Sequence, residues 1–264
     1  MKVKIRHIII LSLPLLFLAT GGSAQKWKLK RYEAIIGVGT AHYFGDIGGA
    51  TTEENWFGLK DIEIQGTRPS IYLGARYKIR QNVAVKANFI YGFLAGDDNG
   101  SLNNDRGCAF SSGIFEPSVQ GEFSIISEEQ RYRSSAIFNR RGMMNNYSKF
   151  NVYVFAGIGG AFLLSVQPNE EMENSIDYDP DHPKFGMTFP MGIGLKYVLS
   201  NKWSVGGELG GRFTTTDYLD AYTTKFSKHN DVYYFFTIQA IYRVRTSRSG
   251  YPVLFGRRRP GGFL

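Results

Sequence analysis

Apolar and polar residues alternate along this chain with a period of two. The clearest stretch is residues 187–199, where every odd position from Met187 to Leu199 is apolar. A three-residue turn at 200–202 follows, and the alternation resumes over residues 203–213. This period places apolar side chains on one face of a β-strand and polar side chains on the other. The stretch therefore predicts a β-hairpin with one apolar and one polar face.

The same alternation recurs in six further segments. With the hairpin, the predicted strands are residues 32–43, 69–79, 83–95, 110–126, 150–164, 187–199, 203–213 and 231–245. Strands of soluble sheets usually have about five or six residues, whereas roughly 9–11 residues cross a bilayer at a tilt. Eight long strands with one apolar face predict an all-β fold, an eight-stranded antiparallel transmembrane β-barrel of the outer-membrane type. A soluble sandwich or jelly roll is the competing architecture.

The connections between these strands alternate between long and short. Four are long, two of the other three (residues 80–82 and 200–202) have three residues, and the remaining connection is residues 127–149. Outer-membrane barrels have long external loops, short periplasmic turns and, with an even strand number, two periplasmic termini. We therefore expect the termini and the connection 127–149 to lie in the periplasm.

The N-terminus reads as a targeting segment. Lys2, Lys4 and Arg6 precede a short apolar run, and Gly22-Ser23-Ala24 follows it, which predicts a signal peptide at residues 1–24, with a retained membrane anchor as the alternative. The predicted organisation is then a basic periplasmic lead-in at 25–31, a barrel at 32–245 and a basic periplasmic tail at 246–264.

Composition agrees with a membrane barrel. Aromatic residues make up 15% of the chain, there are 31 glycines, and the mean hydropathy is −0.22 because half of each predicted strand faces a polar interior. The formal net charge of +8 would also suit a nucleic-acid partner. A signal peptide argues against that partner.

Ten charged residues occupy the polar faces of the predicted strands. An eight-stranded barrel has an interior just wide enough for side chains, so we expect these charges to pair with one another and no diffusion pore to form. Glu116 and Glu122 share one face of a predicted strand, and we interpret them as part of an ion network rather than as an acid/base pair. The ten residues are Glu33, Arg76, Lys78, Lys86, Glu116, Glu122, Lys196, Glu208, Arg212 and Arg243.

The two predicted ends of the barrel differ in charge. The long loops carry sixteen acidic and six basic residues, a net charge of −10. The opposite end is basic, which should attract acidic lipid headgroups or an acidic protein partner, unless it is only a solvated face that orients the barrel. The candidate partner-binding residues are Arg131, Arg133, Arg140, Arg141, Arg257, Arg258 and Arg259.

Three further features have a chemical and a structural interpretation. Cys108, the only cysteine, is either a thiol that pairs with another chain or a small residue beside a strand start. The acidic residues 177–181 lack the glycine and distal glutamate of a calcium-binding EF-hand loop, which favours a solvated loop. His42, His182 and His229 stand in no recognisable serine-hydrolase signature, although a surface lipid hydrolase stays open as an alternative. The sequence indicates no cofactor and no metal site.

Four segments share glycine and aromatic patterns with a known family. They are YFGDIGG (residues 43–49), RGCAF (106–110), NVYVFAGIGGAF (151–162) and a block at 189–220 that contains FPMGIGLKYVLSNKW. Together they resemble the PorG family, the small outer-membrane barrel of the type IX secretion system. The block at 189–220 is the most specific of the four.

The resemblance implies a non-enzymatic role in protein secretion across the outer membrane. In that family the barrel is associated with the periplasmic ring of PorK, a lipoprotein, and PorN. We therefore hypothesise that residues 127–149 and 246–264, with their arginines, form the surface that docks this ring. A general structural or adhesive barrel and a lipid-modifying hydrolase are the alternatives.

Overall fold

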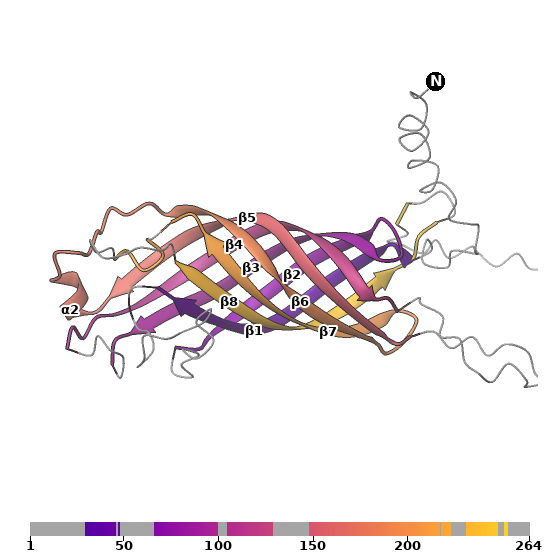
Figure 1. Cartoon of the computed structure of the whole chain (residues 1–264), viewed down its shortest axis with the longest axis horizontal. Coiled ribbons are helices and arrows are strands. Elements are labelled where there is room, and N and C mark those ends of the chain that lie inside the picture. The colour runs from indigo at the N-terminus through magenta and orange to yellow at the C-terminus, as the bar shows by residue number, and fades with distance from the viewer. Residues whose placement is uncertain are drawn as a thin grey trace, which may run out of the picture.

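The computed structural model describes residues 30–45, 47, 66–99, 105–128, 148–216, 218–222, 231–247 and 251–252. Within them, eight strands follow one another along the chain (Figure 1). They are β1 (Tyr32–Phe44), β2 (Arg68–Lys78), β3 (Val83–Asp97), β4 (Ala109–Ile126), β5 (Phe150–Pro168), β6 (Phe185–Val198), β7 (Trp203–Thr214) and β8 (Val232–Val244). All eight predicted strands are confirmed.

The eight strands form a closed antiparallel barrel in chain order. Closure comes from β1 and β8, which pair from Tyr32↔Val244 to Phe44↔Val232. A closed sheet has no free edge, so its backbone N–H and C=O groups bond within the wall, as a bilayer core requires. The predicted barrel is therefore confirmed, and the sandwich alternative is wrong.

The two ends of the barrel are built differently. We call the end with the start of β1, the end of β8 and the tight β2–β3 and β6–β7 turns the turn end. The other end, which carries the long connections and the helix α2 (Glu170–Glu173), is the loop end (Figure 1). No helix in the described part of the chain is long and apolar enough to cross a membrane. The predicted signal peptide, residues 25–29 and residues 253–264 of the tail lie outside the described residues.

The outer wall is apolar and exposed. Along each strand buried and exposed side chains alternate, and the exposed ones are large and apolar, as in Val38 (65% exposed) and Ile193 (58%). Aromatic pairs stand on this wall at the turn end, for example Trp203 with Tyr242 at 5.0 Å between ring centroids. An apolar band flanked by aromatic residues is the exterior of a transmembrane barrel.

Glycines in β6 and β7 give space inside the barrel to aromatic rings from β5. A Cβ atom at Gly194 would lie 2.3 Å from Cζ of Tyr153, and one at Gly192 would lie 2.8 Å from Cζ of Phe155. Real Cβ atoms essentially never make contacts this short. The small residues therefore set where the rings of β5 lie in the interior.

We expect Gly194→Ala to destabilise the barrel by about 1–3 kcal/mol, because the buried Tyr153 ring has no room to retreat. The measurement is the urea midpoint of the refolded protein, followed by heat-modifiable gel migration. Gly121→Ala is the matched control, since its nearest contact would be an ordinary 3.8 Å. Tyr153→Ala should remove most of the penalty of Gly194→Ala, whereas fully additive effects would contradict this packing argument.

Candidate functional site

All ten charged residues predicted on the polar faces are enclosed by the barrel. None of them is more than 7% exposed. Eight lie toward the turn end, and the other two, Glu116 and Arg212, lie nearer the loop end. Glu116 and Glu122 do not form a pair; Glu116 is bonded to Arg212 and Tyr233, and Glu122 to Arg76 and Lys86.

The eight charges at the turn end form one connected network. Arg76 contacts Glu33 at 2.9 Å and Glu122 at 2.6 Å, and Lys86 joins Glu122 at 3.0 Å to Glu208 at 2.5 Å. Tyr153 donates its hydroxyl to Glu208 and accepts a bond of 3.0 Å from Arg76. Each charge thus has a partner, which offsets the cost of its removal from water.

The network also contains a ninth charge that the strand pattern does not reveal. Glu128, just after β4, reaches into the turn end of the barrel. Its carboxylate contacts Lys196 at 3.0 Å, Arg243 at 2.6 Å and the ammonium of Lys78. Glu128 lies beyond the alternating stretch of β4, so periodicity could not assign it to the interior. It ties the first residues of the connection 127–149 to strands β2, β6 and β8.

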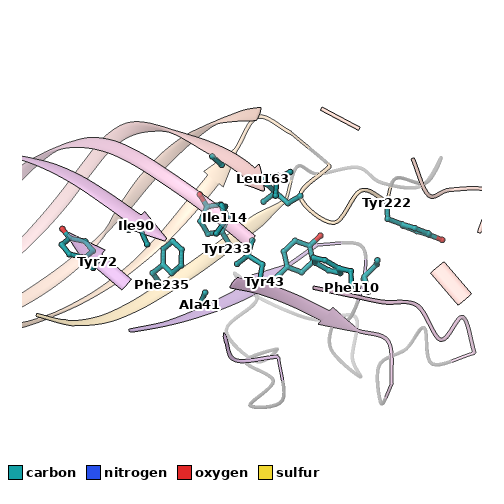
Figure 2. Close-up of a cluster of buried hydrophobic side chains, with 14 of the residues drawn as sticks. Ala41, Tyr43, Tyr72, Ile90, Phe110, Ile114, Leu163, Tyr222, Tyr233 and Phe235 are labelled. Atoms are coloured by element: carbon teal, nitrogen blue, oxygen red, sulfur yellow. The ribbon is translucent and has the colours of Figure 1, made fainter. Parts of the chain in front are cut away.

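The half of the interior nearer the loop end is aromatic and aliphatic. Figure 2 shows this cluster, whose labelled side chains extend from Tyr72 and Ile90 in the barrel to Phe110 and Tyr222 at the loop end. Rings meet edge to face, as in Tyr43 and Phe110 at 4.9 Å. Buried polar side chains, among them Glu116 and Arg212, share this half with the cluster, so the expectation of a polar interior holds there only in part. The sequence pattern did not reveal the inward aromatic residues, because the outward residues next to them are apolar as well and the alternation is lost.

Residues from all four loop-end connections pack into this cluster. Ile47, Cys108, Met172 and Leu219, one from each connection, are buried there, with exposed fractions of 2% or less. Strong polar bonds hold the described parts in place. The Tyr43 hydroxyl lies between two carboxyl groups, 2.8 Å from Oδ2 of Asp220 and 2.8 Å from Oδ1 of Asp231. The described segments thus close the loop end of the interior.

A second set of polar contacts at the loop end involves Arg106. Arg106 makes two bonds to Asp98, at 2.7 and 2.8 Å, and its guanidinium lies 4.9 Å from the centre of the Tyr222 ring. The hydrogen bonds that Arg106 donates to Asp98 raise the pKa of Arg106, so its guanidinium stays charged. Charge-assisted bidentate bonds of this kind fix geometry. These bonds fix the β3–β4 connection, and the contact of Arg106 with the Tyr222 ring joins it to the β7–β8 connection.

The remaining sequence candidates lie at the loop end or outside the described residues. Cys108 is only 1% exposed, and burial raises the pKa of its thiol. The folded chain therefore does not present this thiol to another chain, which argues against an intermolecular disulfide and favours a small buried residue beside a strand start. His42 lies 3.5 Å from the Thr67 hydroxyl, and His182 lies 3.0 Å from the Asp179 carbonyl oxygen. His229 is not among the described residues.

The acidic residues 177–181 form no metal site with three ligands, and none occurs elsewhere in the described part of the chain. All seven candidate partner-binding arginines, at 131, 133, 140, 141 and 257–259, lie outside the described residues. The site that the structure does describe is therefore a filled interior with charged groups at both ends.

No family model and no curated protein matches the chain. Solved structures of small outer-membrane barrels do. Neisserial surface protein A is 8% identical with a TM-score of 0.43, covering 80% of this chain and 96% of its own. OprG from Pseudomonas aeruginosa is 11% identical with a TM-score of 0.39, covering 82% and 98%. At these values the similarity concerns the barrel shape, and no function is transferred from it.

Replacing one member of the charge network should lower the free energy of unfolding more than replacing an exposed charged residue. We expect Lys86→Met to destabilise the barrel by about 3–5 kcal/mol, because Glu122 and Glu208 would lose a partner inside the wall. Lys184→Met, an exposed lysine at the loop end, is the control and should change stability little. Urea unfolding monitored by gel migration measures both. A loss below about 1 kcal/mol for Lys86→Met would refute the role of the network.

Glu128 should give the barrel a specific acid sensitivity. Burial alone would raise its pKa, but Lys196 and Lys78 outweigh burial and lower it from an ordinary value of 4.5 to about 2. A depressed carboxyl pKa contributes stability above about pH 4.5, and that stability is lost as the pH falls toward 2. The stability difference between the native protein and Glu128→Gln should therefore shrink over this range, by about 3 kcal/mol. A difference that does not change with pH would contradict the assignment.

Proposed function

We propose that this protein is a non-enzymatic outer-membrane component of the type IX protein secretion machinery, which positions the periplasmic PorK–PorN ring at the membrane. The resemblance of residues 43–49, 106–110, 151–162 and 189–220 to the PorG family suggests the system. The filled interior is the observation that supports a role other than transport through the barrel. A barrel whose lumen is occupied by its own side chains acts through its ends.

The turn end is the end proposed to face the periplasm. Short turns and both chain termini belong to the periplasmic side of outer-membrane barrels with an even strand number. Among the described residues outside the strands at this end, the only acid, Glu128, is buried in the barrel, and the basic residues are Lys30, Arg31, Arg80, Lys149, Lys202 and Arg245. A basic periplasmic end favours an acidic partner surface and speeds its approach.

The connection 127–149 suits a docking role because both of its ends are held on the barrel. At its start, Glu128 enters the charge network, and the Ser127 hydroxyl donates to the Gln81 carbonyl oxygen at 3.2 Å. At its end, the Val198 amide donates to the Lys149 carbonyl oxygen at 2.8 Å. A segment fixed at both ends loses less conformational entropy on binding than a free one.

The proposal is tested by co-purification from detergent-solubilised membranes. We expect the ring proteins to be lost when residues 246–264 are deleted and Arg131, Arg133, Arg140 and Arg141 are replaced by glutamine, because the steering charge is removed. The control replaces Glu170, Glu171 and Glu173, exposed acids of α2 at the loop end, by glutamine.

Both variants must keep heat-modifiable migration, which shows that the barrel still forms. An unchanged yield of ring proteins with the first variant would refute the docking surface. A deletion strain that secretes normally would favour the structural or adhesive alternative. Loss of a lipid-modifying activity on substitution of His42, His182 or His229 would favour the hydrolase.

A further inference from the structure

Cations stand beside most of the strand ends at the turn end of the barrel. Lys30 and Arg31 precede β1, Arg80 lies in the β2–β3 turn, and Lys149 precedes β5. Lys202 ends the β6–β7 turn, and Arg245 follows β8. We call Arg80, Lys149, Lys202 and Arg245 the cationic rim. They are exposed, and none forms an ion pair within the described part of the chain, unlike the buried charges a few residues further into the barrel.

Large apolar side chains accompany the rim cations. Ile79 (46% exposed) precedes Arg80, and Phe150 (50%) follows Lys149. Trp203 (48%) follows Lys202. These side chains continue the exposed apolar band of the outer wall, and a contiguous apolar surface of this kind marks a membrane or interaction surface. Three of the four rim cations, Arg80, Lys149 and Lys202, thus stand beside an exposed apolar side chain.

The height of the rim on the barrel identifies the membrane interface. Aromatic pairs mark this level on the outer wall, at Tyr32 with Tyr77 and at Phe150 with Tyr197. Aromatic girdles of barrels lie at the boundary between the acyl chains and the headgroups. The rim cations lie one to three residues beyond this aromatic girdle toward the turn end, roughly 3–10 Å along a strand. The headgroup layer beyond the hydrocarbon is roughly 5–7 Å thick on each side.

We propose that the cationic rim binds the phosphate groups of anionic phospholipids in the leaflet at the turn end. The phosphate contacts the lysine or arginine, and the acyl chains cover the neighbouring apolar side chain. Arg31 illustrates the geometry, because its guanidinium donates to the Tyr77 hydroxyl at 3.1 Å on the outer wall. An acidic protein would match the charge, but the apolar side chains beside the cations belong to the outer wall, which acyl chains cover. The proposal does not depend on the type IX role.

Trp203 provides a built-in reporter of lipids at the rim. The chain has three tryptophans, so Trp27→Phe with Trp56→Phe leaves Trp203 alone, directly beside Lys202. The barrel is refolded into vesicles of phosphatidylcholine and phosphatidylglycerol, with bromine on the acyl chains of one or the other lipid. Quenching of Trp203 by each brominated lipid then reports the relative occupancy of the wall at this position.

We expect phosphatidylglycerol to be preferred at Trp203 by about fivefold at low salt, as expected for one cation near a headgroup. The preference should fall toward one at high salt. Lys202→Gln should reduce it, and the four-fold variant Arg80→Gln, Lys149→Gln, Lys202→Gln and Arg245→Gln should abolish it. Lys184→Gln, which removes an exposed cation at the loop end, is the matched control and should leave it unchanged.

Heat-modifiable migration of each variant establishes that the barrel has formed, and Lys202→Gln alone tests the proposal if the four-fold variant does not fold. Equal quenching by the two lipids in the native protein would overturn the proposal. A preference retained in the folded four-fold variant would overturn it as well. If lipid preference is absent and the four-fold variant instead loses an acidic protein on co-purification, the rim is a protein-docking surface.

Discussion

The pairing of β1 with β8 is the constraint on which the rest of this structure depends. It joins residues about 200 positions apart, from Tyr32↔Val244 to Phe44↔Val232, and removes the free edges of the sheet. Once the wall is closed, every strand has one face toward the surroundings and one toward a narrow interior. The exposed face is apolar along its length. The interior face must then satisfy whatever polar and charged groups it carries.

The interior meets that requirement in two different ways along the barrel axis. Toward the turn end, nine charges including Glu128 pair within one network. Toward the loop end, aromatic and aliphatic side chains fill the space, and residues of the connections such as Met172 and Leu219 complete it. Glycines opposite Tyr153 and Phe155 make room for the rings. The result is a barrel whose interior is filled by its own side chains, so its ends are left to contact other molecules.

The two ends differ in charge and in what they offer. The loop end is acidic and closed by bonds such as those of Tyr43 to Asp220 and Asp231. The turn end presents cations beside apolar side chains and holds both ends of the connection 127–149. Such an end suits both a membrane leaflet and a periplasmic assembly.

The sequence by itself determined the eight strands, their outward faces and ten interior charges, because a period of two is a local property of the chain. It did not reveal which charges meet, since Arg76 and Glu208 are brought together only by closure of the barrel. Glu128 and the buried loop residues Ile47 and Leu219 lie in segments without periodicity, so no pattern marks their burial. The tertiary structure decided these contacts, because the narrow lumen selects whichever nearby side chains fill and neutralise it.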